Sequence, residues 1–139
     1  MKIKIPAIAE PLHLSEYHEA MGDEVLWVWV NLSAAKRKEY REIIRDASDA
    51  FAELVKTEAD ERESMIKQVE ELTNKVYAWW ADILSQGDEQ WDAEQVRELG
   101  EQDSGFWEWF VTRYWTFVDE WREEQKKKAK GKPSKSSAE

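Results

Sequence analysis

The chain has 139 residues, no cysteine and a formal net charge of -10. This length fits one domain, and the missing thiols exclude disulfides, thiolate metal sites and a cysteine nucleophile. Residues 126–139 carry about +5, so the first 125 residues carry about -15. An acidic body repels phosphate backbones, so we expect no nucleic acid on the folded part. No run of about 18 apolar residues predicts a membrane span, and the N-terminus lacks a signal-peptide core, so we expect a cytoplasmic protein.

The first 31 residues have patterns typical of β-strands. Residues 2–5 (KIKI) alternate with a period of two, residues 11–14 (PLHL) alternate more weakly, and residues 25–30 (VLWVWV) are rich in β-branched and aromatic side chains. A strand there would place Val25, Trp27 and Trp29 on one face and Leu26, Val28 and Val30 on the other. We therefore expect a small antiparallel element within residues 2–30, whose second face needs another helix or a partner.

From Ser33, which can cap a helix start, the apolar period becomes helical. Residues 34–56 predict a surface helix that buries one stripe, and residues 62–84 predict a second helix that Gly87 closes. The first stripe comprises Tyr40, Ile43, Ile44, Ala47, Phe51, Leu54 and Val55. The link at 57–61 has no glycine or proline, so a hairpin and one long helix both stay open. The hairpin is favoured because a long helix would leave apolar surface uncovered.

Two further helices follow in the sequence. Asp92 with Gln95 predicts the start of a short helix through Leu99, closed by Gly100. Asp103 or Ser104 can cap a last, aromatic-rich helix that we expect to fray near Lys128, and the lysine-rich residues 126–139 predict a disordered tail. The predicted fold class is α+β, mostly α. One folded domain over residues 1–125 combines β-rich residues 1–31 with a bundle of three or four helices in residues 33–125.

The stretch FWEWFVTRYWTFVDEW, residues 106–121, holds four of the nine tryptophans. On a helical wheel Trp107 and Trp121 fall on the apolar face, and we expect them in the core with Trp79 and Trp80. Trp109 falls on the polar face, where an indole is typical of an interface anchor. The alternative is that Trp109 packs under the tail or against the 86–104 loop. We predict partner binding by five tryptophans: Trp109, Trp115, Trp91, Trp27 and Trp29.

No catalytic signature is present in the sequence. Thirty acidic residues guarantee carboxylate pairs by chance, and the five glycines form no phosphate-binding loop. His13 and His18, with Glu16 and Glu19, form the one cluster of ligand-like residue types, but HLSEYH lacks the helical spacing that aims two imidazoles at one metal. We therefore predict no catalytic residue, no metal site and no cofactor, and expect that the protein is not an enzyme.

A β-rich start that ends in EVLWVWVN, an acidic helical middle, the segment WDAEQVRELGEQDSGFWEWFVTRY and a lysine-rich end resemble the tail assembly chaperones of long-tailed bacteriophages. The resemblance covers most of the chain and depends on arrangement, size and aromatic spacing. It implies a protein of the bacterial host cytoplasm that binds the tape measure protein and keeps its hydrophobic helices soluble until tail tube subunits polymerise around them. It also implies a programmed frameshift that extends a fraction of the molecules. Binding of the tail tube protein and oligomerisation stay open.

A function of another class also stays open. The body's charge of about -15 is typical of an acidic inhibitor that mimics DNA in the basic cleft of a nucleic-acid-processing enzyme. Such mimicry needs carboxylates spaced like phosphates on one surface. Here the carboxylates are spread over all polar helix faces, and the basic tail opposes the idea.

Overall fold

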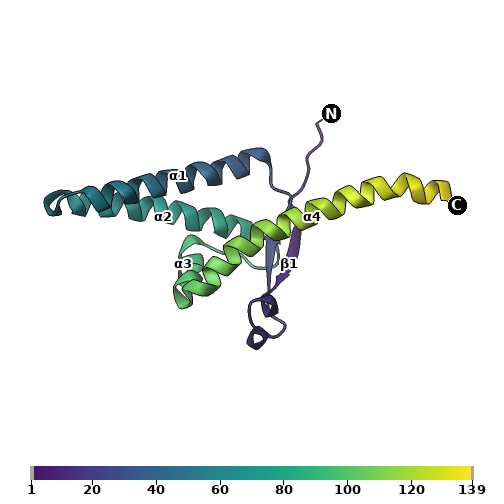
Figure 1. Ribbon diagram of the computed structural model, residues 1–139, viewed down its shortest axis with the longest axis horizontal. Helices are drawn as coiled ribbons and strands as arrows, with labels where there is room; N and C mark the ends of the chain where they lie inside the picture. The colour runs from purple at the N-terminus through teal and green to yellow at the C-terminus, as the bar shows by residue number, and fades with distance from the viewer. Residues whose placement is uncertain (1, 139) are drawn as a thin grey trace.

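The computed structural model describes the backbone of residues 2–138 and the side chains of residues 2–130. It is 71% helical, with four helices and a small two-stranded antiparallel sheet near the N-terminus. Figure 1 shows a central body from which a helical hairpin projects on one side and the last helix on the other. The predicted fold class, α+β and mostly α, is confirmed. In this part of the chain, no helix is both long enough and apolar enough to pass through a bilayer.

The sheet consists of β1 (Ala9–His13) and β2 (Val25–Trp29), which run antiparallel with Leu12 opposite Leu26. The two faces of β2 differ as its alternation predicts. Leu26 and Val28 are buried in the core, whereas Trp27 is 38% exposed. The second face of β2 is thus covered in part only.

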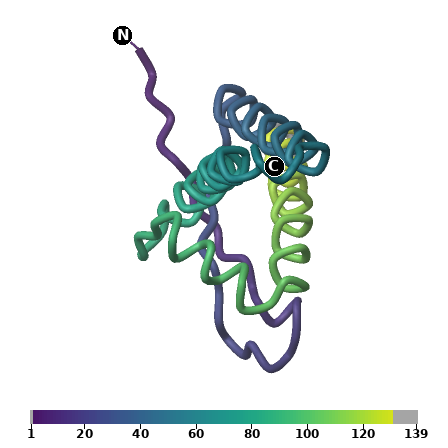
Figure 2. The backbone as a smooth tube through the Cα atoms, turned by 90° about the vertical axis from the view of Figure 1, so that its left-hand side faces the viewer, coloured from purple at the N-terminus to yellow at the C-terminus, as the bar shows by residue number. Residues whose placement is uncertain are grey.

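The prediction of extended pairing at residues 2–5 is wrong, because no strand forms before Ala9. The chain is fastened at Ile8, whose N–H donates to Asn31 Oδ1 at 2.7 Å, and Asn31 Nδ2 donates to the Pro6 carbonyl at 2.9 Å. No strand lies beside residues 2–5 in the described part of the fold. Their alternating side chains therefore have no neighbouring strand with which to form a sheet. Residues 2–8, here called the N-terminal arm, leave the body as an extended segment (Figure 2).

The predicted helical hairpin is confirmed, with α1 (Ala34–Lys56) and α2 (Arg62–Leu84) joined by a short 3₁₀ turn (Ala59–Glu61). Ser33 Oγ accepts from the backbone N–H of Lys36 at 3.0 Å and starts α1. Thr57 takes an extended conformation and ends it. The charged link therefore folds the two apolar stripes back on each other, as the burial of apolar surface requires.

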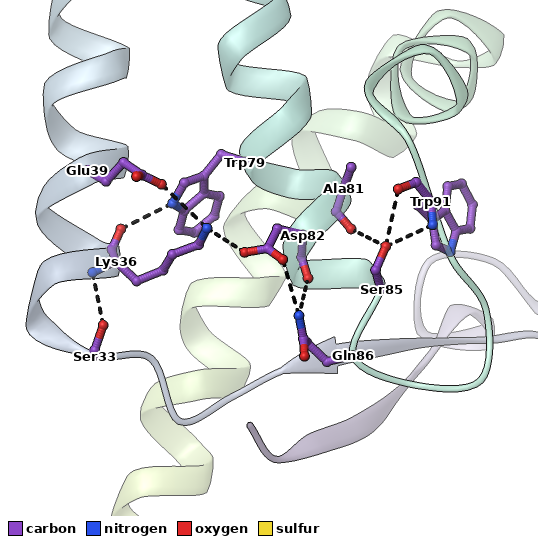
Figure 3. Close-up of polar contacts among 9 residues, drawn as sticks. All are labelled: Ser33, Lys36, Glu39, Trp79, Ala81, Asp82, Ser85, Gln86 and Trp91. Atoms are coloured by element: carbon purple, nitrogen blue, oxygen red, sulfur yellow. Dashed lines mark hydrogen bonds and ion pairs between the residues drawn. The ribbon is translucent and has the colours of Figure 1, made fainter. Parts of the chain in front are cut away.

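The base of the hairpin is fastened by polar contacts (Figure 3). Lys36 Nζ lies 2.5 Å from Asp82 Oδ2, and the indole N–H of Trp79 donates to the Lys36 carbonyl at 3.1 Å. Ser85 Oγ donates to the Ala81 carbonyl at 2.6 Å and accepts from the backbone N–H of Trp91 at 2.8 Å. These bonds fix α1 to α2 and hold the loop after α2.

The prediction that Gly87 closes α2 is wrong. The helix ends at Leu84, and Gly87 lies in the loop without a left-handed conformation. A Cβ at position 87 would lie 2.4 Å from Trp27 Cβ. Position 87 holds a glycine because the loop passes directly against β2. The helix-cap pattern in the sequence does not indicate this requirement.

The capping box predicted at Asp92 and Gln95 is present and starts α3 (Ala93–Gln102). Gly100 lies inside this helix and does not close it, because the chain turns only at Asp103. Asp103 Oδ1 then accepts from the backbone N–H groups of Gly105 and Phe106 and caps α4 (Ser104–Ala138). The backbone of α4 continues past the expected end near Lys128. The side chains of residues 131–139 lie outside the described part of the chain. The predicted disorder of residues 126–139 therefore stays a prediction.

Aromatic side chains from α1, α2 and α4 form the centre of the core. Trp80 is fully buried and contacts the rings of Tyr40, Phe110 and Tyr114 within 5.1–5.5 Å between centroids. The Tyr114 hydroxyl donates to the Trp29 carbonyl at 2.5 Å and connects this cluster to the sheet. The predicted core positions of Trp79 and Trp80 are confirmed, while Trp107 and Trp121 are half-buried against the same cluster.

Two alanine substitutions should have opposite effects on stability. Gly87→Ala should lower the free energy of unfolding by about 1–3 kcal/mol, because its Cβ must displace Trp27 or the loop. Gly100→Ala should raise it by about 0.5–1 kcal/mol, because the new Cβ lies 3.5 Å from Trp107 inside a helix. Urea unfolding followed by circular dichroism measures both, and equal effects of the two variants would contradict these packing assignments.

Candidate partner-binding surface

Trp109 is half-buried, although helical periodicity places it on the polar face of α4. Its ring lies 5.4 Å from Tyr17 and 5.8 Å from Phe106, between centroids. Part of the cover over Trp109 therefore comes from Tyr17, in the segment between the two strands. The Tyr17 hydroxyl donates to Asp103 Oδ2 at 2.7 Å, which holds this segment against the start of α4.

The same hydrogen bond shifts two titrations. It raises the pKa of Tyr17 above the usual value, because ionisation of Tyr17 would remove the donor and place two negative charges together. It lowers the pKa of Asp103, whose carboxylate also accepts from the backbone of Phe106 and Gly105. The hydrogen bond between Tyr17 and Asp103 is therefore at full strength at pH values above the lowered pKa of Asp103 and below the raised pKa of Tyr17.

Trp115 is also half-buried and stacks at 5.9 Å on Trp79, with Tyr40 at 5.4 Å. The guanidinium of Arg37 lies 5.7 Å from the centre of the Trp115 ring. Burial lowers the pKa of Arg37, with the nearby Arg122 as a further cause. Trp115 therefore fixes α4 against the base of the hairpin and offers a partner only part of its surface.

The other three predicted tryptophans lie around the sheet. The indole N–H of Trp29 donates to Asn31 Oδ1 at 2.7 Å, and the backbone of Trp91 is bonded to Ser85. Trp27 is the most exposed of the three at 38%. Trp27 and Trp91 line one groove, whereas Trp109 and Trp115 lie in separate aromatic contacts on α4. The structure thus distributes the five tryptophans over several places.

The hairpin carries the largest exposed apolar side chains on the helices. Phe51 is 58% exposed and Val55 66% exposed, and Ile44 lies seven residues before Phe51 on the same side of α1. Ile66 on α2 is exposed as well. Helix geometry places it on the same side of the hairpin, because the acidic groove on the other side is lined by Gln68. We call these four residues the hairpin stripe.

The distal half of the hairpin has no third layer of structure. Ala50 is the one buried residue of α1, and the buried residues of α2 lie within the segment from Trp79 to Leu84. The side opposite the hairpin stripe forms a groove of about 360 Å³ lined by Asp46, Asp49 and Glu53. The hairpin therefore presents an apolar face and an acidic face, a pattern that a partner's amphipathic helix can cover.

The prediction that Ile44, Phe51 and Val55 lie in a buried stripe is wrong. Near its start, α1 contacts α4 through Tyr40 and Trp115, but farther along α2 covers the side around Ala50 and leaves the flank open. The acidic residues within the link at 57–61 interrupt both stripes at the tip, but this pattern does not show which flank stays open.

Neither the histidines nor the carboxylates form a recognisable reactive site. His18 Nδ1 accepts from the backbone N–H of Ala20 at 2.9 Å, and His13 is exposed. Among residues 2–130, no group of three histidine or carboxylate side chains is placed to hold a metal ion.

Comparison with family models, with curated proteins and with solved structures found no match.

Tyr17→Phe should lower the urea midpoint of unfolding at neutral pH, because it removes the hydrogen bond to Asp103. The pKa of Asp103 is lowered in the fold, so its contribution is present above the ordinary aspartate value of about 4 and is lost as the pH falls through the lowered value. The difference between the two proteins should therefore shrink in acid. Tyr77→Phe is the control, because the Tyr77 hydroxyl makes no hydrogen bond with residues 2–130. A difference that is constant down to the lowest pH would contradict this role.

Hydrogen exchange should reveal a gradient of stability along the hairpin. Amides near Phe51 and Ile66 should exchange faster than amides near Trp80, because the distal half buries little apolar surface. Exchange followed by mass spectrometry measures this, and equal protection along α2 would refute it.

Proposed function

We propose that this chain is a non-catalytic tail assembly chaperone of a long-tailed bacteriophage, which binds the tape measure protein in the host cytoplasm. On this proposal the hairpin stripe covers apolar faces of the partner's helices and keeps them soluble until tail tube subunits polymerise. The observation that carries the proposal is the exposure of Phe51 and Val55 on a hairpin without a third layer. The resemblance in layout and aromatic spacing supplies the identity of the partner.

The chemistry of the hairpin supports this role. A monomeric protein gains nothing from exposing a row of large apolar side chains, and such rows are typical of binding sites. A tape measure helix with an apolar stripe would add the missing layer, in the helix-in-groove manner. The acidic charge of the chain keeps both the free protein and its complex soluble.

Co-expression with a tape measure fragment tests the proposal. The chain should keep the fragment in the soluble fraction, and the purified complex should scatter less light than the fragment alone. A fragment that stays as insoluble as before would refute the proposed partner.

Substitutions on the two faces of the hairpin should separate binding from stability. The double variant Phe51→Ser with Val55→Ser should weaken partner binding at least about tenfold, because it removes apolar anchors at the centre of the stripe. Its melting temperature should change little, because both side chains are exposed. Isothermal titration calorimetry and thermal melts measure the two effects.

The matched control is Asp49→Ser with Glu53→Ser, which changes the opposite, acidic side of the same helix. This variant should bind the partner with little loss. Equal loss in both variants would assign binding to charge or to another surface, and a large drop in melting temperature for the first would place Phe51 and Val55 in the core.

A further inference from the structure

The two edges of the small sheet differ in the backbone N–H and C=O groups that they leave without a hydrogen bond. Hydrogen bonds join Val30 N to the Ile8 carbonyl at 2.9 Å and Leu14 N to the Glu24 carbonyl at 3.0 Å. In an antiparallel pair the bonded positions alternate, so the even-numbered residues of β2 point their backbone groups toward β1. The odd-numbered residues Val25, Trp27 and Trp29 point theirs toward the outer edge.

The outer edge of β2 is open over two residues. The Trp29 carbonyl is taken by the Tyr114 hydroxyl. Among the described residues, no hydrogen bond engages the outward N–H and C=O groups of Val25 and Trp27. On the other side of the sheet, Pro11 stands opposite Trp27 and lacks the N–H that an added strand would use. The β1 edge therefore lacks a donor at its middle, whereas the outward groups of Val25 and Trp27 on the β2 edge have no hydrogen bond among the described residues and lie beside the loop that packs Gly87 against Trp27.

A groove of about 400 Å³ lies along this open edge. Its apolar lining includes Trp27, Trp91 and Leu84, and four exposed carboxylates stand around it: Asp23, Glu24, Asp88 and Glu89. An extended segment that binds here meets apolar side chains and carboxylates in the same groove, so an alternation of apolar and positively charged side chains suits it.

The N-terminal arm has this alternation. Ile3 is 88% exposed and Ile5 is also largely exposed, and Lys2 and Lys4 alternate with them. The arm leaves the body beside Ile8, next to the Trp29 end of β2, whereas the groove lies at the Val25 end. Copies of a chain with a charge of -10 repel each other, so self-association needs a basic element. The arm supplies one, opposite an acidic groove.

We propose that the N-terminal arm of one copy adds as a third strand to the outer edge of β2 in a second copy. Its backbone pairs with Val25 and Trp27, its isoleucines cover Trp27 and Trp91, and its long lysine side chains reach toward the carboxylates around the groove. The contact is separate from the hairpin stripe. A result that contradicts this contact would therefore leave the proposed chaperone function intact, and the reverse also holds.

Sedimentation velocity of the full chain tests this proposal. The protein should associate reversibly as its concentration rises, and salt should weaken the association because charges stand at its rim. Lys2→Glu with Lys4→Glu should raise the dissociation constant at least about tenfold. The matched control is Lys126→Glu with Lys128→Glu, the same change of charge on exposed lysines of α4, and it should have no such effect.

A charge exchange sharpens the test. Asp88→Lys with Glu89→Lys should also weaken self-association, and mixing this variant with Lys2→Glu/Lys4→Glu should restore it, because the basic arm of the first variant then meets the unaltered acidic groove of the second. A chain that stays monomeric at every concentration would overturn the proposal. So would association that the arm variant leaves unchanged, association that Phe51→Ser/Val55→Ser abolishes, or a mixture that does not associate.

Discussion

Trp80 is the residue on which the arrangement of the elements depends. Its buried ring contacts Tyr40 on α1 and Phe110 and Tyr114 on α4, and each such aromatic pair contributes about 0.5–1.5 kcal/mol beyond its buried area. Tyr114 in turn bonds to the Trp29 carbonyl of the sheet. The indole nitrogen of Trp80 is buried and has no hydrogen-bond partner by geometry within residues 2–130, so its ring is held chiefly by packing. The hairpin, the long helix and the sheet are therefore all oriented through one side chain.

This concentration of aromatic packing at one end of the hairpin explains the open surface at the other. The base is held by Trp79 and Trp80 and by the contact of Lys36 with Asp82. Beyond Ala50 the two helices have only each other, and Phe51 faces outward. The hairpin therefore combines a firmly packed base with a loosely packed end, because few contacts fix its distal half.

Local signals were enough to predict much of this fold from the sequence. Ser33, Asp92 and Asp103 satisfy the first N–H groups of the helices that follow, and these short-range bonds do not depend on the rest of the chain. The exposure of Phe51 and the cover over Trp109 could not be read in this way. Both depend on which distant segment packs against a helix flank. Periodicity gives the direction of a side chain within its helix, and it does not identify the neighbour.

Pro11 has a consequence for the behaviour of the chain at high concentration. Cross-β fibrils grow because each added strand exposes a new edge on both sides of the stack. Here the ring nitrogen of Pro11 faces away from β2, so this side of the sheet lacks a donor in its middle. A sheet that can add strands at one edge only cannot grow into an unlimited stack of strands. A chain with exposed isoleucines near its N-terminus is thereby protected from fibril growth through its own sheet.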